Sequence, residues 1–195
     1  MKTIYEGLFS KNPVFGLLLG LVPAVAITYS AYNGLVLGIT TGIILVVAVF
    51  ISSLLKSVVP KGTRPVLHVG VLTILTVIAH SLLLQQNPKV VADLGIFLPL
   101  IVVNSFVLYN LDQDQAMKDA VLSAVGNSLG FVLALVVIGV IREFLSFGTV
   151  FGTRLLESTL PPLALAGTVP GGMVIVGLLL ALYNKITGQG GELHE

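Results

Sequence analysis

Long apolar runs alternate with short polar segments along the chain. A helix that crosses a bilayer needs about 20 mostly apolar residues. Six runs come close to that length, and they cover residues 13–31, 34–55, 66–84, 94–111, 119–141 and 163–183. The pattern therefore predicts an all-α integral membrane protein with six transmembrane helices.

Short polar connections separate the predicted spans. Asn33-Gly34 predicts a tight turn between the first two spans. The loop from Lys56 to Pro65 is basic, and the loop from Asp112 to Asp119 is acidic. The acidic loop is expected to be solvated, with a docking surface for a soluble partner as the alternative.

Basic residues are unevenly divided between the two sets of loops. With six spans, both chain ends lie on one side of the membrane, and that side would carry seven basic residues against three. The seven are Lys2, Lys11, Lys56, Lys61, Arg64, Lys118 and Lys185, and the three are Lys89, Arg142 and Arg154. Because cytoplasmic loops are enriched in Lys and Arg, the count predicts that both termini are cytoplasmic.

The single membrane domain divides into two groups of three spans, residues 1–88 and 89–195. Because each group has an odd number of spans, equivalent spans of the two groups cross the membrane in opposite directions. Local features recur, namely Leu19-Gly20, Pro23 and Tyr32-Asn33 in the first half and Leu94-Gly95, Pro99 and Tyr109-Asn110 in the second. Corresponding interrupted helices are typical of inverted-repeat transporters, where they mark the working site. We therefore expect two inverted three-helix repeats with broken first and fourth helices.

The two prolines indicate where the breaks lie. Proline removes a backbone donor, and irregular backbone inside a bilayer is tolerated only where protein or a water-filled cavity covers it. Thr28, Ser30, Asn104 and Ser105 are close enough in sequence to satisfy the freed backbone groups. The alternative interpretation is a pair of proline kinks without function.

Composition narrows the possible chemistry. Charged residues make up 10% of the 195 residues, against about 25% in a soluble domain. The chain has no cysteine, which excludes an iron–sulfur cluster or thiolate zinc site built from this chain alone. Its histidines are scattered, and no nucleophile with a base or nucleic-acid patch is visible. We therefore assign no catalytic residue, no metal ligand and no nucleic-acid partner.

Ionisable side chains deep in the spans would indicate a proton relay. None is expected there, which argues against a self-contained proton pump, whereas carbonyl and hydroxyl oxygens could still line a sodium path. Arg142 and Glu143 allow two interpretations. They either close span five as an interfacial pair, or the arginine holds a re-entrant or docking segment over residues 144–152.

Three stretches resemble a known family. They are NPVFGLLLGLVPAVAITYSAYNGLVLG (12–38), LGIFLPLIVVNSFVL (94–108) and IREFLSFGTVFG (141–152). They are similar to the small six-span membrane subunits of Rnf and Nqr complexes, and most similar to the E-type subunit of Rnf and the D-type subunit of Nqr. The Asn-Pro opening and the Arg-Glu segment carry that choice, and the likeness runs over nearly the whole chain.

The resemblance implies a prokaryotic inner-membrane complex that couples electron transfer between ferredoxin and NAD to sodium or proton translocation, through flavins and iron–sulfur centres. It also implies a homologous six-span partner subunit of opposite orientation. In the family, the two subunits hold one [2Fe–2S] cluster between them, with two cysteines from each. This chain would be a non-catalytic subunit of such a translocase.

The chain departs from the family at both cluster positions. Gly20-Leu21-Val22-Pro23 stands where the family has Gly-Leu-Cys-Pro, and Asn104-Ser105 stands where it has Asn-Cys. Valine cannot bind iron, and a serine oxygen is a poor substitute for a thiolate. We therefore expect no cofactor bound by this chain alone. The candidate intramembrane site consists of Val22, Pro23, Thr28, Pro99, Asn104 and Ser105.

Two other classes remain open. A membrane component of a vitamin-type importer would also have about six spans and few charges, and Gly16 and Gly20 would suit helix docking in it. A purely structural membrane protein is the third possibility. The paired prolines and the three matched stretches favour the redox complex.

Overall fold

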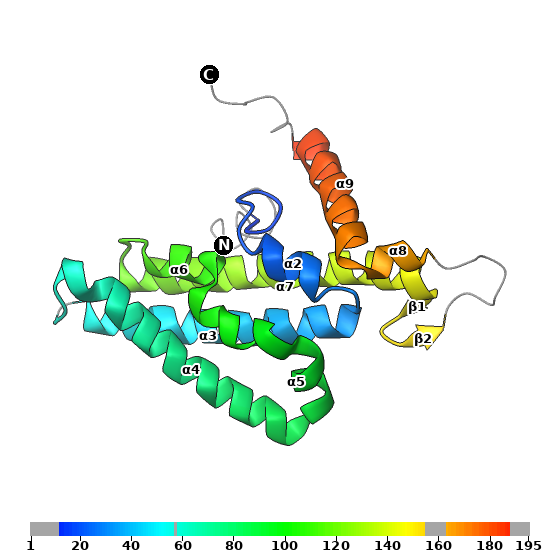
Figure 1. Cartoon of the computed structure of the whole chain (residues 1–195). Helices are drawn as coiled ribbons and strands as arrows, with labels where there is room; N and C mark the ends of the chain where they lie inside the picture. Colours follow the sequence, from blue (N-terminus) through cyan, green and yellow to red (C-terminus); the bar gives the residue numbers. More distant parts are fainter. Residues whose placement is uncertain (1–11, 57, 155–162, 188–195) are drawn as a thin grey trace.

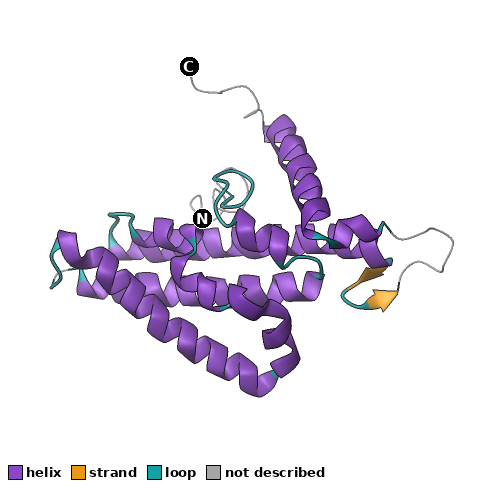
Figure 2. Cartoon of the chain, viewed as in Figure 1, coloured by secondary structure: helices purple, strands orange, loops and turns teal. Residues whose placement is uncertain are grey.

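The computed structural model describes residues 12–56, 58–154 and 163–187, and most of these residues are helical (Figures 1 and 2). The longer helices are α3 (Ala31–Leu55), α4 (Arg64–Gln86), α7 (Met117–Phe147) and α9 (Val169–Thr187). The shorter ones are α2 (Leu21–Ala26), η1 (Lys61–Thr63), α5 (Pro88–Leu94), η2 (Gly95–Phe97), η3 (Pro99–Val103), α6 (Ser105–Leu111) and α8 (Ala164–Gly167). Strands β1 (Thr149–Val150) and β2 (Thr153–Arg154) form a small antiparallel hairpin.

Five helical stretches among the described residues are long and apolar enough to cross a membrane. They are Ala31–Leu55, Lys61–Gln86, Pro88–Leu111, Met117–Phe147 and Val169–Thr187. The predicted span 13–31 is not among them, because residues 13–20 form turns and α2 has only six residues. Large apolar side chains are exposed along α4 and α9, such as Ile74 and Leu178. This surface suits contact with lipid and a multi-pass membrane protein.

Three expected boundaries are wrong. Asn33-Gly34 does not form a turn, since both residues lie inside α3 and are buried. Span five does not close at Arg142, because α7 continues to Phe147 and ends at Gly148, whose φ of 66° is left-handed. The last span is interrupted after α8 at Thr168, so its long helix covers Val169–Thr187 instead of 163–183.

Helices α3 and α7 lie side by side and form the centre of the molecule (Figure 1). Gly34, Gly38 and Gly42 of α3 face α7, and a Cβ atom on each would lie 2.9, 3.1 and 3.1 Å from the nearest α7 atom. Small residues four apart let two helix backbones approach closely. Gly34 is therefore a packing residue and not a turn residue.

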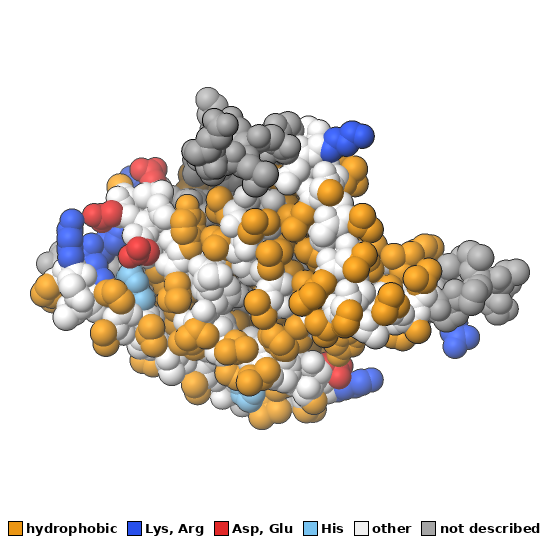
Figure 3. Space-filling model, turned by 45° about the horizontal axis from the view of Figure 1, so that its top comes forward, with side chains coloured by type: hydrophobic (Ala, Val, Ile, Leu, Met, Phe, Trp, Pro, Cys, Tyr) orange, Lys and Arg blue, Asp and Glu red, His pale blue; other side chains and the backbone are white. Residues whose placement is uncertain are grey.

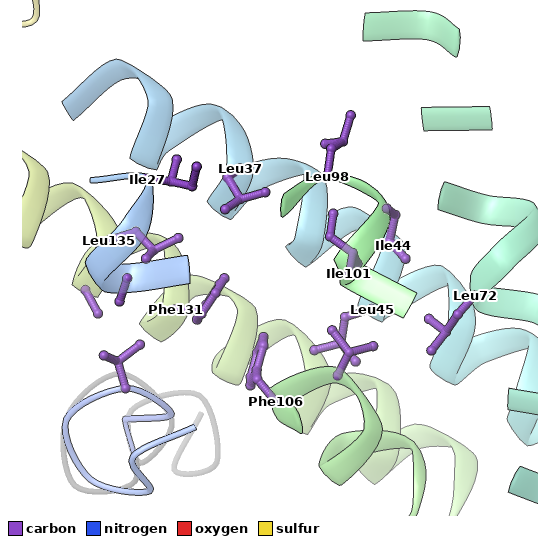
Figure 4. Packing of buried hydrophobic residues seen from close by; sticks show 14 of the residues in the cluster. Ile27, Leu37, Ile44, Leu45, Leu72, Leu98, Ile101, Phe106, Phe131 and Leu135 are labelled. Carbon is purple, nitrogen blue, oxygen red and sulfur yellow. The ribbon is translucent and has the colours of Figure 1, made fainter. Parts of the chain in front are cut away.

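A continuous apolar cluster fills the space between α3, α7 and the short helices (Figure 4). Phe106 of α6 stacks on Phe131 of α7 with ring centroids 4.6 Å apart. Leu72 of α4 reaches into the cluster on the side of Ile44 and Leu45 of α3 (Figure 4). The cluster joins α4 and α6 to the central pair.

Charged side chains gather at the end of the molecule where α3 and α6 finish (Figure 3). The Asp114 carboxylate lies 3.6 Å from Lys56 Nζ, 3.6 Å from Lys61 Nζ and 3.7 Å from Arg64 Nη1. The acidic loop after α6 is thus bound to the basic loop after α3. The two loops share one face, as the predicted topology requires.

Candidate functional site

The first interrupted segment begins with a capped turn. The Asn12 Oδ1 atom accepts hydrogen bonds from the backbone N–H groups of Val14 and Phe15, and its Nδ2 donates to the Gly130 carbonyl of α7 at 3.0 Å. Gly20 follows with φ of 74°, and a Cβ atom there would lie 2.7 Å from the Phe131 ring. Both the backbone conformation and the lack of space require glycine before α2.

The second interrupted segment lies between α5 and α6. Gly95 has φ of 50°, and the chain then forms two short 3₁₀ segments, η2 and η3. Asn104 is extended, with φ of −68° and ψ of 122°, and its Oδ1 accepts a hydrogen bond of 3.0 Å from Phe106 N. Asn104 is therefore the N-cap of α6. The segments 13–31 and 94–111 are therefore both interrupted by residues that are not α-helical.

The two breaks border one cavity of about 480 Å³. Val22 and Pro23 come from the first break, Asn104 and Ser105 from the second, and Thr41 from α3 between them. The structure thus brings four of the six candidate residues together. The other wall residues are mainly apolar, among them Leu18, Leu37, Phe97 and Ile101.

Thr28 and Pro99, the other two candidate residues, lie outside this cavity. Pro99 begins η3 and is exposed. Thr28 is fully buried, donates a hydrogen bond to the Ala24 carbonyl, and accepts one of 3.0 Å from Arg142 Nη1. Thr28 therefore belongs to a second cluster, centred on Arg142, that the sequence did not predict as a site.

The Arg142 guanidinium is fully buried and holds two helix ends together. Its Nη1 donates to the Val25 carbonyl of α2 as well as to Thr28, and its Nε donates to the Ala166 carbonyl of α8 at 3.1 Å. Its Nη2 donates to the Thr168 carbonyl at 3.0 Å and the Gly167 carbonyl at 3.4 Å. Carbonyls at helix C-termini carry partial negative charge, which offsets the buried cation.

Glu143 has the complementary partners. Its Oε2 accepts a hydrogen bond of 2.8 Å from Ala31 N at the start of α3. Its Oε1 accepts from Gly152 N at 2.8 Å and from the Thr149 hydroxyl at 3.0 Å, which fixes the β1–β2 hairpin. A carboxylate at a helix N-terminus satisfies free N–H groups and interacts favourably with the dipole.

The interpretation of Arg142 and Glu143 as an interfacial pair that ends its helix is wrong. Both residues are buried, with exposed fractions of 0% and 3%, and α7 continues past them. Neither residue contradicts the expectation that no ionisable side chain lies deep in a span, because both lie within the last six residues of α7. The signal that could have indicated a buried network is a second pair of charges in this helix, apart from Lys118 and Asp119 in its exposed first turn.

No iron–sulfur ligand set is present in the described part of the chain. The cavity residues at the family's cluster positions offer the Ser105 hydroxyl and no donor from Val22. No group of three or more His, Cys, Asp or Glu residues close enough to hold a metal occurs in residues 12–56, 58–154 and 163–187. The side chains therefore do not fit a cluster held by this chain.

The described residues form several long apolar helices, and two of the predicted spans are interrupted around a shared cavity. These features define a multi-pass helical membrane protein. Residues 1–180 match the sequence model of the family described as "Rnf-Nqr subunit, membrane protein". The chain belongs to this Rnf-Nqr family of membrane subunits.

Named relatives resemble the chain over most of its length. It is 37% identical over 187 residues to the E-type subunit of the Na(+)-translocating ferredoxin:NAD(+) oxidoreductase complex of Acetobacterium woodii, and the match covers 94% of this chain and 95% of that protein. It is 35% identical over 188 residues to the E-type subunit of the proton-translocating ferredoxin:NAD(+) oxidoreductase complex of Clostridium ljungdahlii, covering 92% and 87%. The E-type subunit of an ion-translocating oxidoreductase complex from Methanosarcina acetivorans is 32% identical over 187 residues, covering 92% and 87%. These names give no support to the importer alternative.

Proposed function

We propose that this chain is the E-type membrane subunit of an ion-translocating ferredoxin:NAD oxidoreductase complex. The observation that carries the proposal is the match to subunits of that name over more than nine-tenths of the chain. The subunit is not catalytic alone. Its partners are the other subunits of the complex, which we expect to contain flavins and iron–sulfur clusters.

The candidate site in this proposal is the cavity between the two breaks. Val22, Pro23, Asn104 and Ser105 line it, while Thr28 and Pro99 support the broken segments from outside. Exposed apolar side chains surround its rim, with Val22 69% exposed and Val103 60% exposed. Such a surface around polar, non-helical backbone suits an intramembrane interface with a homologous six-span subunit.

The chemistry assigned to this chain is interface formation and ion coupling, not electron transfer. Thiolates are the ligands that iron–sulfur clusters use, and this chain supplies none. Electrons would therefore pass through other subunits. The inverted three-helix repeats of residues 1–88 and 89–195, the inner-membrane location and the cytoplasmic termini belong to the same proposal, and shared positive φ values at Gly20 and Gly95 support the repeat relation.

The test compares Asn104→Leu with Asn104→Asp in the assembled complex. Aspartate keeps an oxygen that can cap α6, whereas leucine removes it. We expect Asn104→Leu to assemble with its partners yet lose ion accumulation in membrane vesicles, and Asn104→Asp to assemble normally. Normal accumulation in an assembled Asn104→Leu complex would remove Asn104 from the coupling site. Failure of both variants to assemble would favour a purely structural role.

Whether this chain ligates an iron–sulfur cluster is tested separately, by iron analysis and low-temperature electron spin resonance of the purified complex. We expect that no [2Fe–2S] signal depends on Ser105, so the spectrum of the Ser105→Ala complex should match that of the wild-type complex. A signal that depends on Ser105 would contradict the assignment of electron transfer to other subunits.

A further inference from the structure

Besides Arg64, whose Nε is unpaired but whose other nitrogens contact Lys56 and Asp114, four buried polar side chains of α3 and α4 have an atom without a hydrogen-bond partner in the described structure. They are Thr41 and Ser52 of α3 and His68 and Thr76 of α4, with exposed fractions of 0%, 3%, 5% and 4%. Buried polar groups nearly always have a partner, and where no protein atom serves, the partner is commonly an ordered water or ion. A row of four on two facing helices is therefore informative.

Neighbouring hydroxyls behave differently. Thr73, on the exposed side of the same helix α4, donates to the Val69 carbonyl at 2.8 Å. Ser146 of α7 donates to the Arg142 carbonyl at 2.6 Å in the same way. Ser and Thr inside helices usually pair with the carbonyl four residues earlier when no other partner exists. Thr41, Ser52 and Thr76 do not, so their oxygens remain free for another ligand.

The row follows the seam between the two helices. The buried residues of α4 are only His68, Leu72 and Thr76, which are spaced four apart and form one stripe. A rise of 1.5 Å per residue separates His68 from Thr76 by about 12 Å and Thr41 from Ser52 by about 16 Å. Because α3 and α4 are consecutive and pack against each other, Ser52 and His68 lie toward the basic loop, and Thr41 and Thr76 lie deeper.

Each end of the seam reaches a hollow that has polar side chains in its wall. Thr41 lines the cavity between the two breaks. Ser52 borders a small depression together with Lys56, Asn110 and Gln113, next to the charged end of the molecule. Between the two ends lie the buried side chains of Leu45 and Leu72 (Figure 4). The seam is therefore polar at both ends and closed by an apolar layer in the middle.

We propose that the α3–α4 seam binds water and provides the route between the basic loop and the cavity for the monovalent cation that the complex moves. The assignment of a moved cation rests on the function proposed above, whereas the hydration of the seam does not. Hydroxyl oxygens and bound water can serve both sodium and proton transfer. Leu45 and Leu72 form the constriction, which must open for passage.

The absence of cysteine makes hydration directly measurable, because any introduced thiol is the only one in this chain. Single variants Ser52→Cys and Thr76→Cys are assembled into the complex in membrane vesicles and treated with a charged, membrane-impermeant methanethiosulfonate. Thr73→Cys is the matched control, because Thr73 lies three residues from Thr76 on the face of α4 that suits contact with lipid and not with water. Only the thiolate reacts, and dry apolar surroundings suppress its formation.

We expect both seam cysteines to be labelled at least about tenfold faster than the Thr73→Cys control, as measured by mass spectrometry of this chain. Labelling no faster than the control, in complexes that assemble, would overturn the hydration of the seam. Such a result would mean that the hydroxyls rotate onto their own helix carbonyls and the seam is dry.

The route itself is tested with Thr76→Val, which keeps the shape and removes the hydroxyl, beside Thr73→Val. Sodium uptake and internal pH are both followed in vesicles, together with ferredoxin-dependent NAD reduction. We expect Thr76→Val to lose most ion accumulation while electron transfer continues, and Thr73→Val to behave as wild type. Unchanged accumulation in Thr76→Val would overturn the route. If the wild-type complex moved neither cation, the proposed function would fail and the labelling result would still decide hydration.

Discussion

The Glu143 carboxylate of α7 accepts a 2.8 Å hydrogen bond from the backbone N–H of Ala31, so a side chain from one long helix caps the start of the other. The cap lies where the two helices pack tightly, since a Cβ atom on Gly139 would be 2.8 Å from the Ala31 Cα. A buried acid thus fixes the point at which the first interrupted segment becomes a continuous helix.

Removing this cap should destabilise the protein. We expect Glu143→Ala to lower the free energy of unfolding by about 2–4 kcal/mol, because it leaves the buried N–H group of Ala31 without an acceptor and removes the hydrogen bonds that hold Gly152 and Thr149. Thermal unfolding of the purified protein in detergent measures the change. Asp119→Asn, on the exposed first turn of α7, serves as the control and should alter stability by less than about 0.5 kcal/mol. Equal effects of the two substitutions would contradict the capping role.

Arg142 should tolerate neither loss nor replacement of its planar group. Arg142→Met removes the guanidinium donors of the Val25, Ala166 and Thr168 carbonyls, of which Thr168 keeps Gly172 N as a second donor, and we expect a loss of about 2–4 kcal/mol. Arg142→Lys keeps the charge but cannot donate in three directions from a rigid fork, so it should rescue only part of the loss. Protease resistance of α8 and its flanks reports the local effect. Full rescue by lysine would show that charge alone matters.

Two glycines on α9 should respond in opposite directions to alanine. A Cβ atom on Gly172 would lie 2.7 Å from the Arg142 guanidinium carbon, and we expect Gly172→Ala to destabilise by about 1–3 kcal/mol. A Cβ atom on Gly177 would meet nothing within 4 Å, so Gly177→Ala should be neutral or stabilise the helix by up to about 1 kcal/mol. Unfolding temperatures of the two variants measure the difference, and the same sign for both would contradict the packing around Arg142.

The contact between the two charged loops should depend on pH. Lys61, and then Lys56, lower the pKa of the Asp114 carboxyl below its ordinary value of 3.8. A lowered pKa in the folded state means that the stabilising contribution is complete above pH 3.8 and is lost as the pH falls through the lowered value. Spin labels placed at Val58 and Gln115 should separate on acidification. Asp114→Asn should already show the separated state at neutral pH, and an unchanged distance would contradict the tether.

Restoring the two missing thiolates would test whether the cavity still has the geometry of a cluster site. Val22 and Ser105 border the same cavity. In the assembled complex, we expect Val22→Cys with Ser105→Cys to raise the iron content and to give a [2Fe–2S] spin signal if a partner supplies the other two ligands. A disulfide between the two cysteines without iron would show that the site on the partner side is absent.

Local sequence signals predicted the two interrupted segments because glycine and proline act on their own backbone. Gly20 and Gly95 have positive φ, and Asn104 caps the helix that follows it. The same kind of signal failed at Asn33-Gly34, where the need for close contact with Leu135 of α7 outweighs the turn preference of the dipeptide. Backbone chemistry is local, whereas helix contacts depend on the whole fold.

The hydrogen-bond partners of Arg142 could not be predicted because its acceptors are distant in sequence. Val25 and Ala166 lie 117 and 24 residues away from the arginine. Nothing in a single sequence indicates which carbonyls a broken helix leaves free or which side chain reaches them. The distance from Pro23 identifies Thr28 in the sequence, whereas for its partner Arg142 the sequence leaves open an interfacial pair or a held re-entrant or docking segment.

One guanidinium ties α2, which borders the cavity, to the junction of α8 and α9. A shift in the tilt of α9 would have to break hydrogen bonds at Ala166 and Thr168 or carry the arginine with it, and the arginine also holds Val25. The shape of the cavity between the two breaks is therefore mechanically linked to the orientation of α9. A neighbouring protein that changes the tilt of α9 would therefore also change the shape of this cavity.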